Sequence, residues 1–259
     1  MKTLFMEERR RLILDKLVKQ GRVSVAELSA DLDVSAVTIR QDLTALEIDK
    51  LLKRTHGGAV QIEENNLEDG LELSFDLRRQ QQIDEKMALG KAAMSLIETG
   101  SAIAFDASTT VCSIVPFLTE LDNLTLVTNN LIATEALLTN PRVEVLLPAG
   151  KLRRDAYSII GDPNSLPNIN LNMGFVSAWG ISEQAGLTEV NQEEMAMKKA
   201  LLSRCMKKVL LVDSQKWGQV AAYTYAHPND IDIILTTNRV PQATLAKIQH
   251  PDIRIITVE

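Results

Sequence analysis

Residues 34–44 carry side chains that suit contacts with nucleic acid. They read Val-Ser-Ala-Val-Thr-Ile-Arg-Gln-Asp-Leu-Thr, with Ser35 placed to cap a helix. Arg pairs with guanine and Gln with adenine in the major groove, and hydroxyls near a helix N-terminus suit phosphates. A hairpin predicted over 51–62 adds cations around a Gly-Gly turn. The candidate DNA contacts are Ser24, Ser35, Ala36, Val37, Thr38, Arg40, Gln41, Thr44, Lys53, Arg54, His56 and Gly57.

A second set of polar side chains follows five apolar runs later in the chain. Ligands of open α/β sheets bind outside the carboxyl ends of the strands, so these positions predict a binding edge. Hydroxyls where a helix begins suit an anion, Lys and Arg add positive charge, and Asp can accept hydrogen bonds from sugar hydroxyls. The candidate residues of this edge are Asp106, Ser108, Thr109, Thr110, Thr128, Asn129, Asn130, Gly150, Lys151, Arg153, Gly180, Asp213 and Lys216.

The combination of anion-binding and hydroxyl-binding groups favours a phosphorylated sugar or polyol as the ligand. The sequence has no Gly-x-x-x-x-Gly-Lys-Ser/Thr loop and no Gly-x-Gly-x-x-Gly, which counts against ATP or a dinucleotide. Two cysteines and three histidines form neither a disulfide framework nor a metal-ligand spacing. We therefore expect no metal, no cofactor and no catalytic residues.

The elements that position these residues belong to two kinds of domain. Helices are predicted before Gly21, over 25–31 and from Ser35 to about 49, followed by the hairpin, which is typical of a winged helix-turn-helix. Beyond the polar, acidic stretch 63–70, apolar runs at 102–105, 124–127, 143–147, 175–178, 209–212, 231–235 and 253–258 alternate with helical patterns at 84–97, 109–118, 131–138 and 193–206. Such runs indicate a Rossmann-like, mainly parallel sheet covered on both faces.

We therefore predict an α/β protein with three parts. Residues 1–62 form a winged helix-turn-helix, 63–82 a linker with a connecting helix, and 83–259 an effector-binding domain. The net charge is −6, but residues 1–62 carry +2 and the remainder −8. This asymmetry fits a chain in which only the first part meets phosphate backbones. No apolar run approaches the ~18 residues of a membrane helix, and the charged N-terminus is unlike a secretory signal, so we expect a cytoplasmic protein.

Both parts resemble the DeoR family of bacterial regulators. The N-terminal match consists of residues 23–28, 34–43 and 51–59, although the family usually has two arginines where this chain has Arg40 and Gln41. The C-terminal match consists of 106–110, 128–130, 150–153, 160–161, 186–188, 193–194 with Lys198, and 212–218. The resemblance implies a sensor domain with a fold similar to sugar-phosphate isomerases. It also implies an effector contact at Lys86, where family members often place a lysine.

The resulting hypothesis is a regulator that binds operator DNA as a dimer or tetramer and responds to a phosphorylated sugar or polyol. From the family resemblance, we expect the protein to repress a carbohydrate operon and the metabolite to relieve this repression. Activation is the other possibility. A sugar-phosphate isomerase or deaminase is the alternative, but such an enzyme has no use for the winged helix. An architectural DNA binder with a purely oligomerising body is a third hypothesis, and the polar strand ends argue against it.

Overall fold

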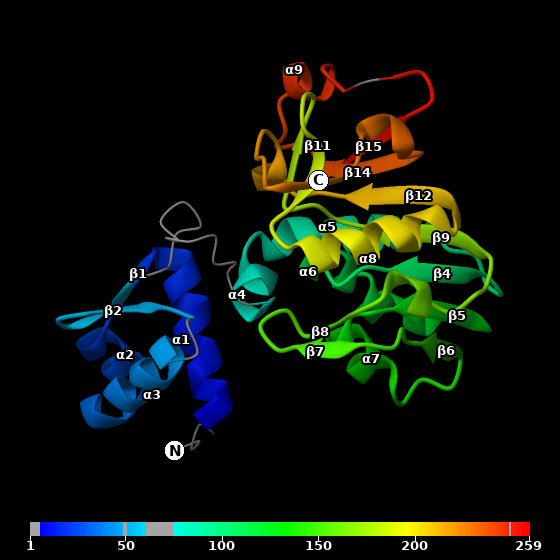
Figure 1. Ribbon diagram of the computed structural model, residues 1–259. Helices are drawn as coiled ribbons and strands as arrows, with labels where there is room; N and C mark the ends of the chain where they lie inside the picture. The colour runs from blue at the N-terminus through cyan, green and yellow to red at the C-terminus, as the bar shows by residue number, and fades with distance from the viewer. Residues whose placement is uncertain (1–5, 49–50, 61–74, 249) are drawn as a thin grey trace. The chain divides into compact units, whose positions relative to one another are not determined.

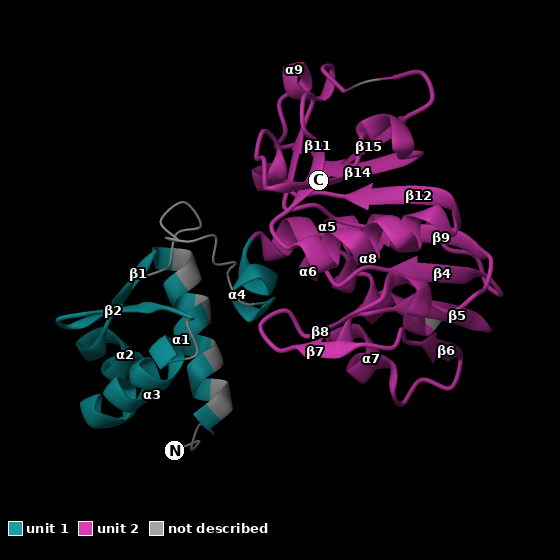
Figure 2. Cartoon of the chain, viewed as in Figure 1, with its two compact units in different colours: residues 1–81 teal, residues 82–259 magenta. Residues whose placement is uncertain are grey.

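The computed structural model describes residues 6–48, 51–60, 75–248 and 250–259. The chain divides into two compact units, residues 1–81 and 82–259, shown in different colours in Figure 2. The second unit begins one residue before the predicted effector-binding domain. The acidic part of the predicted linker, residues 63–70, lies outside the described residues.

The N-terminal unit is a winged helix-turn-helix, as predicted. Its helices are α1 (Met6–Gln20), α2 (Val25–Leu32), α3 (Ala36–Ile48) and α4 (Phe75–Gln80), and its strands are β1 (Arg22–Ser24), β2 (Lys53–Thr55) and β3 (Gly58–Val60). The strands form an antiparallel sheet in the order β1-β3-β2. Ser24 caps α2 by accepting a hydrogen bond from the Glu27 amide at 3.2 Å. Apolar side chains from all four helices share one core, with Ile13, Leu28, Leu43 and Leu77 among its members.

The C-terminal unit is built on a seven-stranded sheet in the order β15-β14-β12-β9-β4-β5-β6, in which every neighbouring pair is parallel (Figure 1). The strands are β4 (Ala102–Phe105), β5 (Leu124–Thr128), β6 (Val143–Leu146), β9 (Leu171–Val176), β12 (Cys205–Leu211), β14 (Ile233–Thr237) and β15 (Arg254–Val258). All seven apolar runs therefore overlap strands of this sheet, and the prediction of a mainly parallel sheet is confirmed.

Two apolar layers cover the sheet. Alternate residues of one strand serve different layers, so Phe105 packs edge-on against Phe175 in one core while Ala104 faces the other. The helices α5 (Ile83–Met94), α6 (Thr109–Cys112) and α7 (Leu131–Leu137) contribute to the first layer. The helix α8 (Gln192–Ser203) contributes to the second, and α9 (Gln242–Leu245) follows β14. Short 3-10 helices lie at Val115–Glu120, Pro163–Ser165, Ser214–Lys216 and Pro228–Asp230.

Two smaller sheets lie outside the seven strands. The strands β7 (Lys151–Arg153) and β8 (Ser158–Ile160) form a hairpin, and β10 (Gly180–Ser182), β11 (Gly186–Glu189) and β13 (Tyr223–Ala226) form an antiparallel sheet. In the main sheet the chain runs outward from β4 to β5 and β6, and then from β9 in the opposite direction to β12, β14 and β15. The strands β4 and β9 are neighbours, so the switch point of the sheet lies between their carboxyl ends.

Candidate DNA-binding helix and effector site

Helix α3 presents the predicted DNA-reading residues on its outer face. Ile39, Leu43 and Leu46 are buried, while Val37, Arg40, Gln41 and Thr44 are exposed. Ser35 caps the helix by accepting a hydrogen bond from the Thr38 amide at 3.1 Å. Val37, Arg40, Gln41 and Thr44 also line an open hollow together with Ala45 and Ile48. This arrangement leaves an Arg and a Gln on one face for contacts with base edges.

Asp42 clamps α3 to α1, a role that the sequence pattern did not reveal. Its side chain is 3% exposed and accepts hydrogen bonds from Arg9 at 2.5 and 3.2 Å and from Arg10 at 3.2 Å. A buried carboxylate with two guanidinium partners fixes the orientation of the helix that carries it. Asp42 therefore positions the DNA-reading face and does not belong to it.

The hairpin of the wing is also tied to α3. The Arg54 guanidinium donates to the Thr44 hydroxyl at 2.7 Å, and the Arg54 amide donates to the Glu47 carboxylate at 2.9 Å. Lys53, His56 and Gly57 are exposed, and the Gly57 carbonyl accepts a hydrogen bond from the amide of Val25 at the start of α2. The wing and the reading helix thus form one surface. Whether these residues contact DNA stays a prediction.

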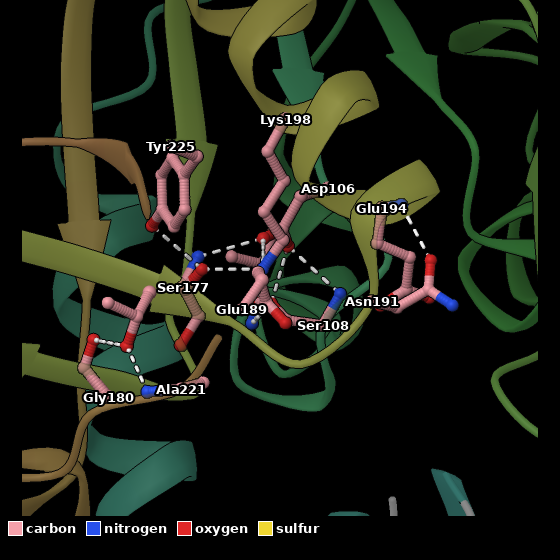
Figure 3. A network of polar contacts seen from close by, with 12 residues as sticks. Asp106, Ser108, Ser177, Gly180, Glu189, Asn191, Glu194, Lys198, Ala221 and Tyr225 are labelled. Carbon is pink, nitrogen blue, oxygen red and sulfur yellow. Dashed lines mark hydrogen bonds and ion pairs between the residues drawn. The ribbon is translucent and has the colours of Figure 1, made fainter. Parts of the chain in front are cut away.

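A buried ion cluster occupies the switch point of the C-terminal sheet (Figure 3). The ammonium of Lys198, from α8, lies 3.0 Å from Asp106 at the end of β4 and also forms an ion pair with Glu189 at the end of β11. It donates a further hydrogen bond to the carbonyl of Ser177, which follows β9, at 2.6 Å. Burial alone would lower the pKa of Lys198, but the two carboxylates outweigh it and raise the pKa well above the usual value. Lys198 is therefore charged at neutral pH.

Asp106 joins the two strands that flank the switch point. One carboxylate oxygen accepts hydrogen bonds from the amide and hydroxyl of Ser108, at 2.9 and 2.5 Å. The other accepts from the Ser177 amide at 2.9 Å and from Lys198. Since four donors already surround this carboxylate, Asp106 holds the Ser108 loop in place. A sugar hydroxyl would have to displace one of these donors to bind it.

The hairpin β7–β8 brings the predicted cations of its loop next to acidic residues. Arg153 lies 2.9 Å from Glu194 and 3.0 Å from Asp155. Lys151 pairs with Glu193 at 2.9 Å, in an exposed position. A bound anion would therefore compete with these carboxylates for both cations. Glu193 and Glu194 open α8, so the hairpin is tied to the helix that carries Lys198.

Asn130, just after the end of β5, has a buried side-chain amide that is only partly hydrogen-bonded. It is fully buried, and its side-chain oxygen caps α7 by accepting hydrogen bonds from the amides of Ile132 and Ala133 at 2.9 and 3.0 Å. Its side-chain nitrogen finds no hydrogen-bond partner among the described residues. A buried donor without a partner costs free energy, so this amide is well suited to an oxygen atom of a ligand. The neighbouring Asn129 donates to the Ile159 carbonyl at 3.1 Å and so fixes the hairpin.

The remaining effector candidates lie along the same edge. Thr109, Thr110 and Thr128 are buried at the ends of β4 and β5, and Lys86 is buried in α5. Gly150 and Gly180 are places where a Cβ atom would collide with the carbonyls of Ile160 and Gln219, respectively. Asp213 is buried and accepts a hydrogen bond from the Gln215 amide, and the ammonium of Lys216 lies 6.0 Å from the centre of the Trp179 ring.

The candidate edge is wider than one small ligand. Asp213 follows β12 and Gly150 follows β6, which are four strand spacings apart in the sheet order. At ~4.8 Å for each spacing, these ends are separated by roughly 19 Å. The ends of β9, β4 and β5 are contiguous and flank the switch point. They are the part of the predicted site that the fold brings together most closely.

Comparisons with known proteins assign the chain to a family. Residues 9–65 match the family model described as the DeoR-like helix-turn-helix domain, and residues 81–238 match the DeoR C terminal sensor domain. The chain belongs to the DeoR family of transcriptional regulators. The expectation of a regulator, as opposed to an enzyme, is confirmed by these matches, as is the family resemblance noted in the sequence.

Curated relatives cover almost the whole chain. The HTH-type transcriptional regulator GolR of Listeria innocua is 32% identical over 99% of this chain and 100% of its own. The HTH-type transcriptional repressor GlcR of Bacillus subtilis is 28% identical, over 99% and 98%. The putative aga operon transcriptional repressor of Escherichia coli O157:H7 is 29% identical, over 97% and 93%.

A solved structure is similar over most of the chain, but only distantly. The sorbitol operon regulator SorC of Klebsiella pneumoniae matches with 13% identity and a TM-score of 0.43, over 93% of this chain and 99% of that one.

Among the described residues, no group of His, Cys, Asp and Glu side chains is arranged to hold a metal ion. No helix in the described ranges is long and apolar enough to cross a membrane.

Proposed function

We propose that this DeoR-family protein represses a carbohydrate-catabolism operon and leaves its operator when a phosphorylated sugar or polyol binds. The proposal rests on one observation: polar groups suited to a ligand gather at the switch-point edge of the C-terminal sheet, in a chain whose N-terminal unit carries a candidate DNA-reading helix. Buried hydroxyls, an amide donor without a partner and nearby cations gather there. Two of the relatives are described as repressors, one of them of the aga operon.

The protein acts in the cytoplasm as a dimer or tetramer. A single helix such as α3 reads too few base pairs for specific binding, so two copies on adjacent half-sites are needed. Within each copy, the proposed DNA contacts are the exposed side chains of α3 and the wing. The proposed effector contacts centre on Ser108, Thr109, Thr110, Thr128 and Asn130.

The isomerase alternative finds little support in the geometry of the switch point. Proton abstraction from a sugar phosphate needs a carboxylate or amine that can take a proton. Both oxygens of Asp106 are already held by two donors each, and Lys198 is kept protonated by its two carboxylate partners. The cluster is suited to holding loops in place.

Asn130 offers a direct test of the effector site. Asn130→Asp keeps the oxygen that caps α7 and the size of the side chain, but it replaces the amide donor with a second acceptor oxygen and adds a negative charge, which Asn140→Asp adds as well. We expect operator affinity to be unchanged and the concentration of phosphorylated sugar needed for release to rise at least about tenfold, as for a buried hydrogen bond worth ~1.5 kcal/mol. Fluorescence anisotropy with labelled operator, titrated with pentose and hexose phosphates, measures both quantities.

Asn140→Asp is the matched control. Asn140 also has a side-chain nitrogen without a partner, but it precedes β6 and so lies toward the opposite edge of the sheet. This variant should respond as the wild type does. An unchanged response of Asn130→Asp, or an equal loss in both variants, would remove Asn130 from the site.

A further inference from the structure

Glu85 joins three separate segments of the C-terminal unit. It lies in the first turn of α5 and its side chain is 3% exposed. One carboxylate oxygen accepts hydrogen bonds from the Ser214 hydroxyl at 2.8 Å and from Arg239 at 3.0 Å. The other accepts from the Ser214 amide at 2.8 Å and from the Thr237 hydroxyl at 2.7 Å. The start of α5 is thus bound to the loop after β12 and to the end of β14.

This carboxylate is held as an anion. Burial alone would raise the pKa of Glu85, but hydrogen bonds from Thr237 and Ser214 and the charge of Arg239 outweigh it and lower the pKa. Each oxygen faces two donors, so a neutral amide in its place would turn donor groups toward donor groups. The contact therefore depends on the charged form and on both oxygens.

The contact at Glu85 links the loop of two candidate effector residues to the start of α5, close to the N-terminal unit in the sequence. Ser214 sits between Asp213 and Lys216, two of the candidate effector residues. At the other end, only Gln81 and Gln82 separate α5 from α4, and α4 places Leu77 in the core of the N-terminal unit. Gln82 adopts a left-handed backbone conformation with φ of 49°, and its side chain accepts a hydrogen bond from Arg239 at 3.4 Å. Such a conformation is costly for a residue with a side chain and needs support from its surroundings.

We propose that Glu85 is a positioning residue that transmits changes in the Ser214 loop to the start of α5, and from there along the chain to the DNA-binding unit. The proposal rests on the proposed function and adds that the effector also reaches the Ser214 loop, which follows β12, the neighbour of β9 in the sheet. A ligand that moves this loop disturbs up to two of the four hydrogen bonds at Glu85. The first turn of α5 then shifts, and a connection of two residues passes the shift to α4. Because coupling between two sites is reciprocal, bound DNA must weaken effector binding as much as the effector weakens DNA binding. If the Ser214 loop carries this coupling, DNA binding also alters the loop.

Reciprocity allows a test that uses DNA and no sugar. Hydrogen–deuterium exchange of the full chain is measured with and without a duplex from upstream of the protein's own gene. In the wild type, we expect operator binding to change the exchange of amides 213–217 by about fivefold or more, the lower end of typical allosteric couplings. In Glu85→Gln we expect the change at 213–217 to disappear, while the change in α3 remains.

Two further variants make the test specific. Asp84→Asn removes a carboxylate of the same helical turn from an exposed position and should transmit as the wild type does. Ser214→Ala removes one of the four hydrogen bonds, which covers the case in which Glu85→Gln fails to fold, and should reduce the change at 213–217. The proposal would be overturned if operator binding left the exchange of amides 213–217 unchanged in the wild type. It would also be overturned if this exchange changed as much in both Glu85→Gln and Ser214→Ala as in the wild type. Because no sugar is used, failure of the proposed effector class would appear separately, as operator release by no sugar phosphate.

Discussion

Replacing Lys198 with Met tests the role of the buried cluster most severely. The ammonium group lies 3.0 Å from Asp106, pairs with Glu189 and donates to the Ser177 carbonyl, and the side chain is only 7% exposed. Met occupies a similar volume but leaves two carboxylates buried without their cation. Breaking a buried ion pair by removing one partner costs about 3–5 kcal/mol, and two stranded carboxylates place this variant toward the upper end.

Urea unfolding followed by tryptophan fluorescence measures this loss in the full chain. Both tryptophans, Trp179 and Trp217, belong to the C-terminal unit, so their signal reports on that unit. With a slope of about 2.5 kcal/mol/M, we expect the midpoint to fall by about 1–2 M. Lys199→Met, one residue along and exposed, is the control and should stay within about 0.5 kcal/mol of the wild type. A loss below about 1 kcal/mol in Lys198→Met would mean that Lys198 is not the cation on which the buried cluster depends.

Four further predictions concern other contacts. Asp42→Ala should destabilise the N-terminal unit by about 1–3 kcal/mol and weaken DNA binding, as measured by thermal unfolding and anisotropy; an unchanged melting temperature would contradict the clamp. Gly58→Ala should unfold or distort the wing and weaken DNA binding, because the added Cβ would collide with the backbone of β1. The control is Gly57→Ala, whose Cβ would have no neighbouring atom within 4 Å, and equal DNA affinities of the two variants would contradict the predicted collision. Arg40→Ala should cost about 1–3 kcal/mol of operator affinity and relax one base preference, which a panel of substituted duplexes would show or disprove. Folding lowers the pKa of Glu85, so the carboxylate stabilises the fold fully above the unfolded pKa of 4.5, and this stabilisation is lost as pH falls through the folded pKa. The free energies of unfolding of Glu85→Gln and the wild type should therefore differ at pH 7 and converge only below about pH 4.5.

The parallel sheet was predictable because its strands are buried on both faces. Each strand reads as a continuous apolar run, such as Ala102–Phe105, and burial of this kind leaves a strong signal in sequence. The hairpin β7–β8 and the sheet β10-β11-β13 were missed, since their short strands mix polar and apolar residues, as in Lys151–Arg153 and Gly186–Glu189, and so form no apolar run. The helix predicted over 109–118 is interrupted, because Pro116 lies in the first turn of a separate 3-10 helix, Val115–Glu120.

The candidate site was predictable in its placement but not in its contacts. Parallel strands end at one edge, so the polar residues after β4, β5, β9 and β12 had to lie along it. Which side chains pair there depends on packing between distant segments. The sequence predicts Lys151 and Arg153 as cations for a ligand, whereas the structure sets each beside a carboxylate of α8. Glu189 and Glu85 were missed altogether, since nothing in their sequence neighbourhoods indicates the partners that the fold supplies.

Fluorescence anisotropy tests effector-controlled release from the operator. The DNA is a duplex from upstream of the protein's own gene, and the salt concentration is fixed because DNA affinity depends on it. The labelled duplex is first bound by the protein and then titrated with phosphorylated sugars and with the same sugars unphosphorylated. We expect release by one phosphorylated sugar or polyol and not by its free form. Specific binding that no phosphorylated compound disturbs would contradict the proposed effector, and absence of specific binding to this DNA would contradict the proposed operator.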